Sequence, residues 1–181
     1  MKVIICGGGV IGTSTAYFLS QRNVEAVVVE RTGVANGASG KSGGFLALDW
    51  CDGSPLAPLA RRSFALHERL AADFETNWGY RPVETLGVVS SARRDISAYR
   101  KLPSPDWLGE GAAVHGQLGT PASTAQIDPA AFTHAMMAAA IANGARLVTG
   151  CAEGISRDPH KGTVTGVTVD GAVLRCDAVV I

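Results

Sequence analysis

The chain has 181 residues, of which 46% are hydrophobic and 18% are charged, and its 16 basic residues balance its 16 acidic residues. This length allows one sizeable core, or one domain and part of another. A net charge of zero gives no electrostatic argument for nucleic acid or an anionic membrane as a partner. The longest apolar run falls short of the roughly 18 residues that a membrane span needs.

The first residues predict a strand that runs into a glycine turn. An apolar, β-branched run over residues 2–6 leads into Gly7-Gly8-Gly9-Val10-Ile11-Gly12, which matches G-x-G-x-x-G. A helix is expected from about Val10 to Gln21, and a second apolar run over residues 24–29 ends at Glu30. Strand, glycine turn, helix, strand and acid follow one another at the spacing of a dinucleotide-binding βαβ unit.

Each glycine of this fingerprint has its own predicted role. Gly7 allows the sharp turn off the strand, Gly9 lets a pyrophosphate approach the backbone, and Gly12 lets the helix pack close to the strands. The N–H groups that open the helix, at Val10 and Ile11, are expected to face the phosphates. The side chain of Ile11 is expected to contribute apolar surface for the sheet.

Glu30 lies eighteen residues after Gly12, at the tip of the second predicted strand. Its carboxylate is expected to accept hydrogen bonds from both ribose hydroxyls of an adenosine and to repel a 2′-phosphate, which disfavours NADP. This pattern does not separate FAD from NAD, and a glycine turn without any ligand is the structural alternative.

The next residues, Arg31 to Gly44, resemble the D-amino-acid-oxidase-like family of FAD-dependent oxidoreductases. Members of that family carry an acid–Arg pair after the second strand, here Glu30 and Arg31, followed by a Ser- and Gly-rich stretch along the cofactor. A flexible Gly/Ser linker is the alternative interpretation. The resemblance implies FAD contacts from a group of small, polar or basic residues: Ser39, Gly40, Lys41, Ser42, Gly43 and Gly44.

The resemblance continues downstream. Asp128 is a predicted N-cap with Pro129 at the first helical position, and Asn143-Gly144 is a predicted C-terminal cap. The family places the strand after this helix, here residues 146–149, beside the adenine, which makes Cys151 or Ala152 the candidate contact. Two further strands over residues 163–169 and 172–176, joined by an Asp-Gly hairpin turn, precede a buried strand over residues 178–181.

The resemblance implies an α/β fold, a Rossmann-like FAD-binding domain of the glutathione-reductase and D-amino-acid-oxidase type, with the beginning of an inserted α+β substrate domain. We expect residues 1–49 to form the FAD-binding βαβ unit and glycine motif, residues 50–123 to start the substrate domain, and residues 124–181 to return to the FAD-binding domain. The chain resembles the first half of a family member, so a fragment is expected, with a natural short protein as the alternative.

The middle of the chain gives weaker signals. Residues 58–78 have helical periodicity, residues 83–90 read as a strand, and residues 102–119 are expected to be irregular because they are rich in Pro and Gly. We expect Trp50 to pack in a core, and the alternative is that residues 48–51 reach the flavin side of the pocket. The four histidines and four cysteines lack metal-ligand or catalytic spacing, so no metal is expected, and unpaired cysteines favour a reducing, cytoplasmic compartment.

Two classes of function follow from these patterns. The first is an FAD-dependent oxidoreductase, or its N-terminal part, that oxidises a small amine, amino acid or hydroxy acid by hydride transfer to the flavin. The second is a truncated, non-catalytic nucleotide-binding or interaction domain, and an NAD-only domain is a further alternative. A small-molecule substrate is the expected partner. The sequence identifies neither a catalytic residue nor the oligomeric state.

Overall fold

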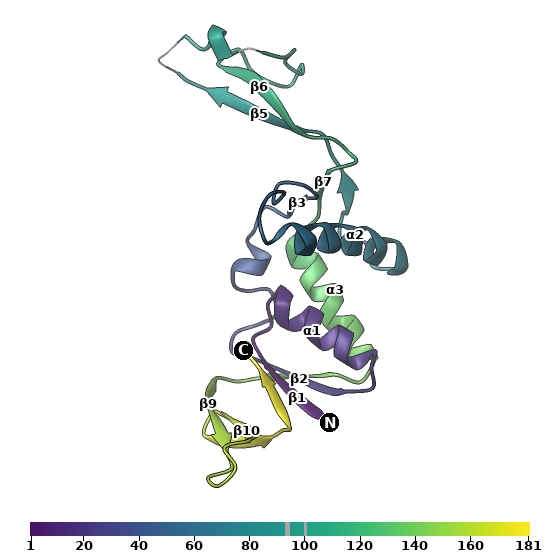
Figure 1. Cartoon of the computed structure of the whole chain (residues 1–181), viewed down its shortest axis with the longest axis vertical. Coiled ribbons are helices and arrows are strands. Elements are labelled where there is room, and N and C mark those ends of the chain that lie inside the picture. The colour runs from purple at the N-terminus through teal and green to yellow at the C-terminus, as the bar shows by residue number, and fades with distance from the viewer. Residues whose placement is uncertain (93–94, 100) are drawn as a thin grey trace. The chain divides into compact units, whose positions relative to one another are not determined.

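The computed structural model of the chain describes residues 1–92, 95–99 and 101–181 (Figure 1). These residues form two compact units. The first unit combines residues 1–43 with residues 128–181, and the second consists of residues 44–127. The chain therefore leaves the first unit after its glycine-rich stretch and returns to it just before a long helix.

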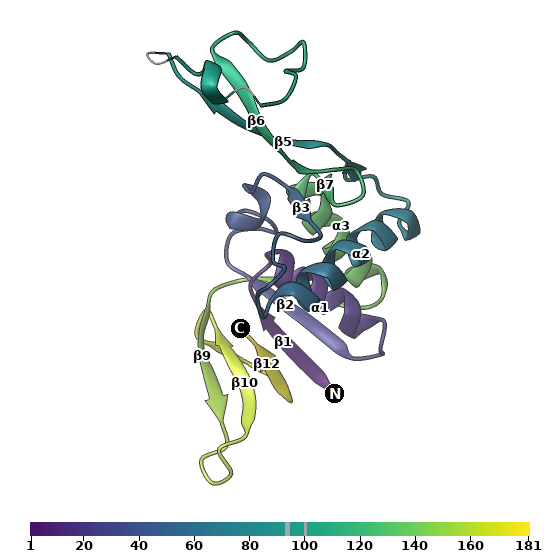
Figure 2. The ribbon, with the colours of Figure 1, turned by 45° about the horizontal axis from the view of Figure 1, so that its top comes forward.

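The first unit is built on a parallel sheet. Its strands are β1 (Lys2–Cys6), β2 (Glu25–Glu30), β8 (Arg146–Thr149) and β12 (Ala178–Val180). They lie in the order β12-β1-β2-β8, and Figure 2 labels the first three of them. All three pairings are parallel. The apolar runs of β1 and β2 are buried along nearly their whole length, as expected for strands that are covered on both faces.

Helices cover one face of this sheet. Helix α1 (Val10–Ser20) packs on β1 and β2 and against helix α3 (Pro129–Ala142), which also contacts β8. Ala16 of α1 is fully buried, which agrees with the close helix–sheet packing that the sequence predicts. Ile11, by contrast, is 74% exposed, so the expectation that it supplies apolar surface for the sheet was wrong.

A second, three-stranded sheet covers the other face. Its strands β9 (Ala152–Arg157), β10 (Val164–Val169) and β11 (Ala172–Arg175) form an antiparallel sheet in the order β11-β10-β9. Ile4, Val27 and Val29 of the parallel sheet share one apolar core with Val167 and Val169 of β10. Side chains therefore fill both sides of the parallel sheet, and the unit has three layers.

Local sequence signals define the ends of these elements. The Oδ1 atom of Asp128 accepts a hydrogen bond from the N–H of Ala131 at 2.9 Å, which confirms the predicted N-cap of α3. Gly144 follows the helix with φ +93°, as the predicted C-terminal cap requires. Asp170 and Gly171, with φ of +46° and +78°, form the predicted tight turn between β10 and β11.

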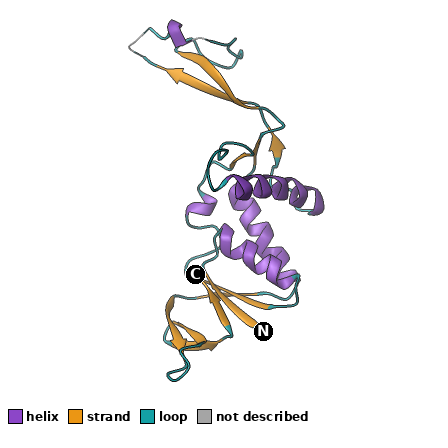
Figure 3. Cartoon of the chain, in the orientation of Figure 1, coloured by secondary structure: helices purple, strands orange, loops and turns teal. Residues whose placement is uncertain are grey.

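The described residues of the second unit form an α-helix, a short 3-10 helix and two small antiparallel sheets (Figure 3). Helix α2 spans Ala57–Asp73, and a short 3-10 helix, η2, spans Ser97–Tyr99. The first sheet has the order β3-β7-β4, from β3 (Phe45–Ala47), β7 (Thr124–Gln126) and β4 (Arg81–Pro82). The second pairs β5 (Thr85–Ser90) with β6 (Ala112–Gly119).

Three predictions for this region need correction. Residues 112–119 form strand β6 rather than irregular structure, because their main chain pairs along β5 although the side chains are mostly small. The helix ends at Asp73 instead of continuing to Trp78, since the backbone becomes extended at Phe74. Trp50 is 53% exposed and stacks at a tilt on Phe45, with 4.9 Å between ring centroids, so it is not a core residue.

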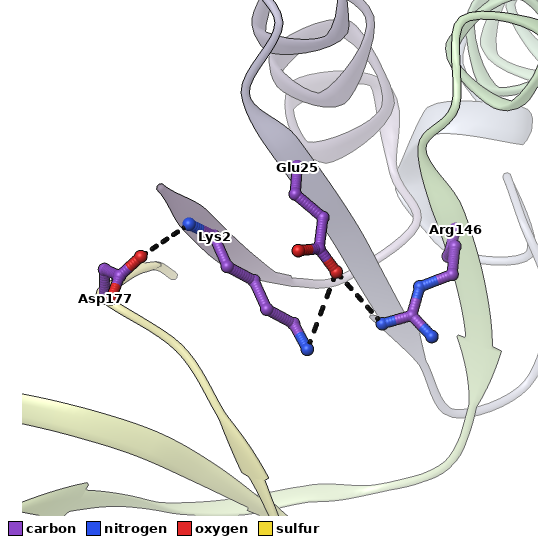
Figure 4. A network of polar contacts seen from close by, with 4 residues as sticks. All are labelled: Lys2, Glu25, Arg146 and Asp177. Atoms are coloured by element: carbon purple, nitrogen blue, oxygen red, sulfur yellow. Dashed lines mark hydrogen bonds and ion pairs between the residues drawn. The ribbon is translucent and has the colours of Figure 1, made fainter.

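Polar contacts join the strands of the parallel sheet at its rim (Figure 4). Glu25 of β2 lies 3.7 Å from the Nζ of Lys2 and accepts a hydrogen bond from Arg146 of β8 at 3.3 Å. The backbone N–H of Lys2 donates to the carboxylate of Asp177 at 2.7 Å. These contacts bridge β1, β2, β8 and the residue that precedes β12.

Candidate functional site

The candidate site begins in the turn between β1 and α1. Gly7 has φ +114°, a conformation that side chains disfavour, and its N–H donates to the carbonyl of Val29 at 2.8 Å. The first hydrogen bond of α1 runs from the N–H of Thr13 to the carbonyl of Gly9 at 3.0 Å. The N–H groups of Ile11 and Gly12 therefore have no acceptor within the helix and are available to an anion.

Gly12 makes the close approach that the sequence predicts. A Cβ atom at this position would lie 2.0 Å from the carbonyl oxygen of Gly7 and 3.2 Å from a methyl carbon of Ile5. The backbone at Gly7 and the buried strand that carries Ile5 could move away only at a considerable cost in free energy. Glycine at this position therefore fixes the start of α1 against β1, and this sets where the free N–H groups point.

Ser39 reaches the same helix end from a distant part of the chain. It belongs to a short 3-10 helix, η1 (Ala38–Gly40), and its hydroxyl oxygen accepts a hydrogen bond from the N–H of Val10 at 2.9 Å. A Cβ atom at Gly9 would lie 3.0 Å from the Oγ of Ser39. The glycine-rich stretch is thus ordered around the helix N-terminus at Ser39 and is not simply a flexible linker.

The other predicted residues of this stretch differ in their surroundings. Gly40 packs tightly, since a Cβ atom there would lie 2.1 Å from the carbonyl of Ala35. The exposed ones are Arg31, Lys41, Ser42 and Gly43. Gly44 belongs to the second unit, has φ +65°, and accepts a hydrogen bond from the N–H of Ile127 at 2.8 Å.

The carboxylate of Glu30 lies at the end of β2 and is held by backbone donors. One oxygen, Oε2, accepts from the N–H of Gly8 at 2.8 Å. The other, Oε1, accepts from the N–H of Thr32 at 2.8 Å, from the hydroxyl of Thr32 at 3.0 Å and from the N–H of Gly33 at 3.3 Å. The side chain is therefore fixed in one orientation over the glycine turn.

These donors also control the charge of Glu30. The N–H of Thr32 has the largest effect, and the N–H of Gly8, the hydroxyl of Thr32 and the N–H of Gly33 add to it, against the opposing effect of partial burial. Together they lower the pKa of Glu30 from 4.5 to about 2. Glu30 is consequently a permanent anion at neutral pH.

Ala152, the predicted adenine contact, is exposed at the start of β9. Two residues before it, the N–H of Gly150 donates to the backbone carbonyl of Glu30 at 3.0 Å. The segment that leaves β8 is thereby tied to the same strand end as the acid.

Sequence reasoning missed Gly8 and Thr32. Gly8 occupies a position that the fingerprint leaves open, yet a Cβ atom there would lie 3.0 Å from the Cγ of Glu30. Thr32 supplies two of the four donors to the carboxylate. The signal for Thr32 was its place two residues after an acid, where Ser and Thr side chains commonly bond to their neighbours.

The arrangement fits an adenine dinucleotide. An anion of phosphate size would meet the free N–H groups of α1 without interference from a side chain at Gly9. A fixed acceptor, Glu30, stands at the tip of the neighbouring strand, which is where such folds hold a ribose. Among the described residues, no group of three or more His, Cys, Asp or Glu side chains is placed to hold a metal ion.

The sequence model of a family described as FAD dependent oxidoreductase matches residues 2–181. The chain belongs to this family. Members of the family use FAD, so FAD is the cofactor of this protein. No helix within residues 1–92, 95–99 and 101–181 is both long and apolar enough to cross a membrane.

Similar proteins are longer than this chain. A Schizosaccharomyces pombe protein classed provisionally as an oxidoreductase is 32% identical over 145 residues, which are 75% of this chain and 37% of that protein. A D-amino acid dehydrogenase of Xylella fastidiosa is 37% identical over 83 residues, which are 43% of this chain and 19% of that protein. The crystal structure of glycine oxidase from Bacillus cereus matches 98% of this chain and 55% of its own, with a TM-score of 0.78 and 25% identity.

Proposed function

We propose that this chain forms the ADP-binding part of an FAD-dependent oxidoreductase that acts on a small amine, amino acid or hydroxy acid. The observation that carries the proposal is the pairing of a free helix N-terminus with a fixed carboxylate. The N–H groups of Ile11 and Gly12 and the side chain of Glu30 lie at the ends of adjacent strands, β1 and β2. N–H groups that can donate to a phosphate and a carboxylate that can accept from a ribose therefore lie side by side.

In this proposal, the pyrophosphate of FAD lies over Gly7 and Gly9 at the start of α1. The N–H groups of Ile11 and Gly12 donate toward it, and the Ser39 hydroxyl, which already accepts from the N–H of Val10, turns its proton toward a phosphate oxygen. Lys41 and Arg31 add positive charge, and Ser42 adds a hydroxyl. Backbone N–H groups come from Gly40, Gly43 and Gly44. Ala152 touches the adenine through its backbone.

The substrate class rests on similar proteins. Their names describe a glycine oxidase and a D-amino acid dehydrogenase, both of which act on amino acids. FAD, when bound, supplies the capacity to accept a hydride from carbon. We infer that residues 1–49 and 124–181 hold the cofactor, that residues 50–123 begin the substrate domain, and that the protein works in the cytoplasm, where its unpaired thiols stay reduced.

The test is FAD binding by the full chain and by the variant Gly9→Val. A valine side chain at Gly9 occupies the space that a pyrophosphate needs, so we expect FAD affinity to fall by about 100-fold or more. Titration of FAD into the protein, followed by flavin fluorescence, measures the dissociation constants.

Gly154→Val is the matched control, because a Cβ atom at this strand position meets nothing within 4 Å. We expect the control to bind FAD like the unmodified chain and to unfold at a similar temperature. Equal FAD affinity in Gly9→Val and Gly154→Val, or a chain that never binds FAD, would overturn the proposal.

A further inference from the structure

The two oxygens of the Glu30 carboxylate are not equally available. Oε1 already accepts three hydrogen bonds, from the N–H and the hydroxyl of Thr32 and from the N–H of Gly33. Oε2 accepts one, from the N–H of Gly8, and no other among the described residues. Because a carboxylate oxygen offers about two lone-pair positions, one open position remains, and it lies on Oε2.

Glu30 alone therefore does not suit two ribose hydroxyls. A second hydroxyl would have to displace a donor from Oε1, and every donor there belongs to the residues that directly follow β2. We expected Glu30 to accept from both ribose hydroxyls. With one open position, it accepts from only one of them, and the other needs a different acceptor.

Thr32 offers the acceptor that is missing. Its hydroxyl uses its only proton to donate to Oε1 of Glu30 at 3.0 Å, so both lone pairs of the oxygen can still accept a hydrogen bond. The side chain is exposed, and no donor to this oxygen occurs among residues 1–92, 95–99 and 101–181. A hydroxyl that donates to a carboxylate is also polarised, which makes it a better acceptor.

We propose that Thr32 is a second ribose-binding residue: one hydroxyl of the adenosine ribose donates to Oε2 of Glu30, and the other donates to the Oγ1 of Thr32. The pair then recognises a vicinal diol in which each hydroxyl keeps its proton. A ribose that carries a 2′-phosphate lacks one of the two donors and brings a charge toward Glu30. This inference rests on the proposed function, since it concerns the same nucleotide.

The experiment measures the binding of ADP, 2′-deoxy-ADP and 3′-deoxy-ADP by isothermal titration calorimetry. It uses the full chain and the variants Thr32→Val, Thr32→Ser and Glu30→Gln. Thr32→Val keeps the shape of the side chain and removes the hydroxyl, whereas Thr32→Ser keeps the hydroxyl. We expect Thr32→Val to weaken ADP binding by about fivefold to tenfold, as for one lost hydrogen bond, and Thr32→Ser to stay within about twofold.

The deoxy nucleotides separate a ribose contact from a merely structural role. If Thr32 and Glu30 each hold one hydroxyl, Thr32→Val has no further effect on one deoxy nucleotide, and Glu30→Gln loses most of its effect on the other. If Thr32 only orients Glu30, Thr32→Val weakens both deoxy nucleotides by one common factor, and the inference is wrong.

Two further outcomes keep this inference distinct from the proposed function. A chain that binds FAD and ADP while Thr32→Val binds ADP equally well overturns the ribose contact and leaves the FAD site standing. A chain that binds neither nucleotide overturns both.

Discussion

The strands of the parallel sheet in the first unit and the surface around β3 and β6 in the second unit differ in how deeply their apolar side chains are buried. In the first unit, Ile4, Val27 and Val28 of the parallel sheet are almost fully buried, because layers cover both faces. In the second unit, Phe45 is 40% exposed, Trp50 53% and Leu118 50%. Layers thus cover both faces of the parallel sheet in the first unit, while these three side chains of the second unit lie at its surface, so the two groups of residues should respond differently to substitution.

The sharpest contrast within the second unit is between two tryptophans. Trp78 is 2% exposed and meets Phe74 edge to face, with 5.2 Å between ring centroids. Trp78→Ala should lower the free energy of unfolding by about 3–5 kcal/mol, since it opens a cavity of indole size. Thermal unfolding measures this, and we expect hydrogen exchange to rise mainly within residues 44–127.

Trp50→Ala is the matched control for Trp78→Ala. It removes the ring contact with Phe45 and a hydrogen bond from its indole N–H to the carbonyl of Leu118, both at the surface. The loss should be about 1 kcal/mol. If Trp50→Ala cost as much as Trp78→Ala, the exposed aromatic surface would be a structural element and the contrast between the units would disappear.

Gly12→Ala tests the packing of the first unit. Its new methyl group would lie 2.0 Å from the carbonyl oxygen of Gly7, so the backbone of the turn or the helix must shift. We expect a loss of about 1–3 kcal/mol in the free energy of unfolding, with increased hydrogen exchange in β1 and α1. Gly154→Ala lies in open space on β9 and should change stability by no more than about 0.5 kcal/mol. Equal effects of the two variants would show that the turn relaxes freely.

The smallest expected effect is electrostatic and depends on pH. The pKa of Glu30 lies near 2 in the folded chain, below its ordinary value of 4.5, because the N–H of Thr32 and its neighbours favour the anion. Ionised Glu30 therefore stabilises the first unit above pH 4.5, and this contribution is lost as the pH falls from about 4.5 to about 2. Urea unfolding should show Glu30→Gln less stable than the unmodified chain at pH 7 and equally stable at pH 2.

An exposed carboxylate of the second unit is the comparison for Glu30. Asp52 forms an ion pair with Arg61, whose hydrogen bond lowers the pKa of Asp52, but both side chains are about half exposed. Solvent screens such pairs, so Asp52→Asn should leave the unfolding curve unchanged between pH 7 and pH 4. A larger pH effect from Asp52→Asn than from Glu30→Gln would contradict this assignment of the two carboxylates.

The elements that could be predicted from the sequence were those with strong patterns among neighbouring residues. The βαβ unit, the cap at Asp128 and the turn at Asp170-Gly171 were predictable because neighbouring residues determine them. Strand β6 was not, since its small residues carry no alternating pattern and its pairing partner, β5, lies more than twenty residues earlier. The exposure of Trp50 was equally hidden, because an aromatic residue in a sequence does not indicate what surrounds it.

In the candidate site, too, features set by neighbouring residues were predictable and contacts between distant residues were not. The positions of Gly7, Gly12 and Glu30 follow from spacing alone, since a strand and a helix of known rise bring them together. The hydrogen bond from Val10 to Ser39 joins residues 29 positions apart, and no sequence pattern predicts that distance. The unequal use of the two oxygens of Glu30 depends on the conformation of Thr32 and Gly33, and only coordinates can give it.

The order of the parallel sheet has a consequence for synthesis on the ribosome. One edge of strand β1 pairs with β12, which is made more than 170 residues after it. At about 5–20 residues per second, that edge stays open for roughly 10 to 35 s. Residues 44–127 emerge within this interval, so the second unit has the opportunity to fold before β12 pairs with β1.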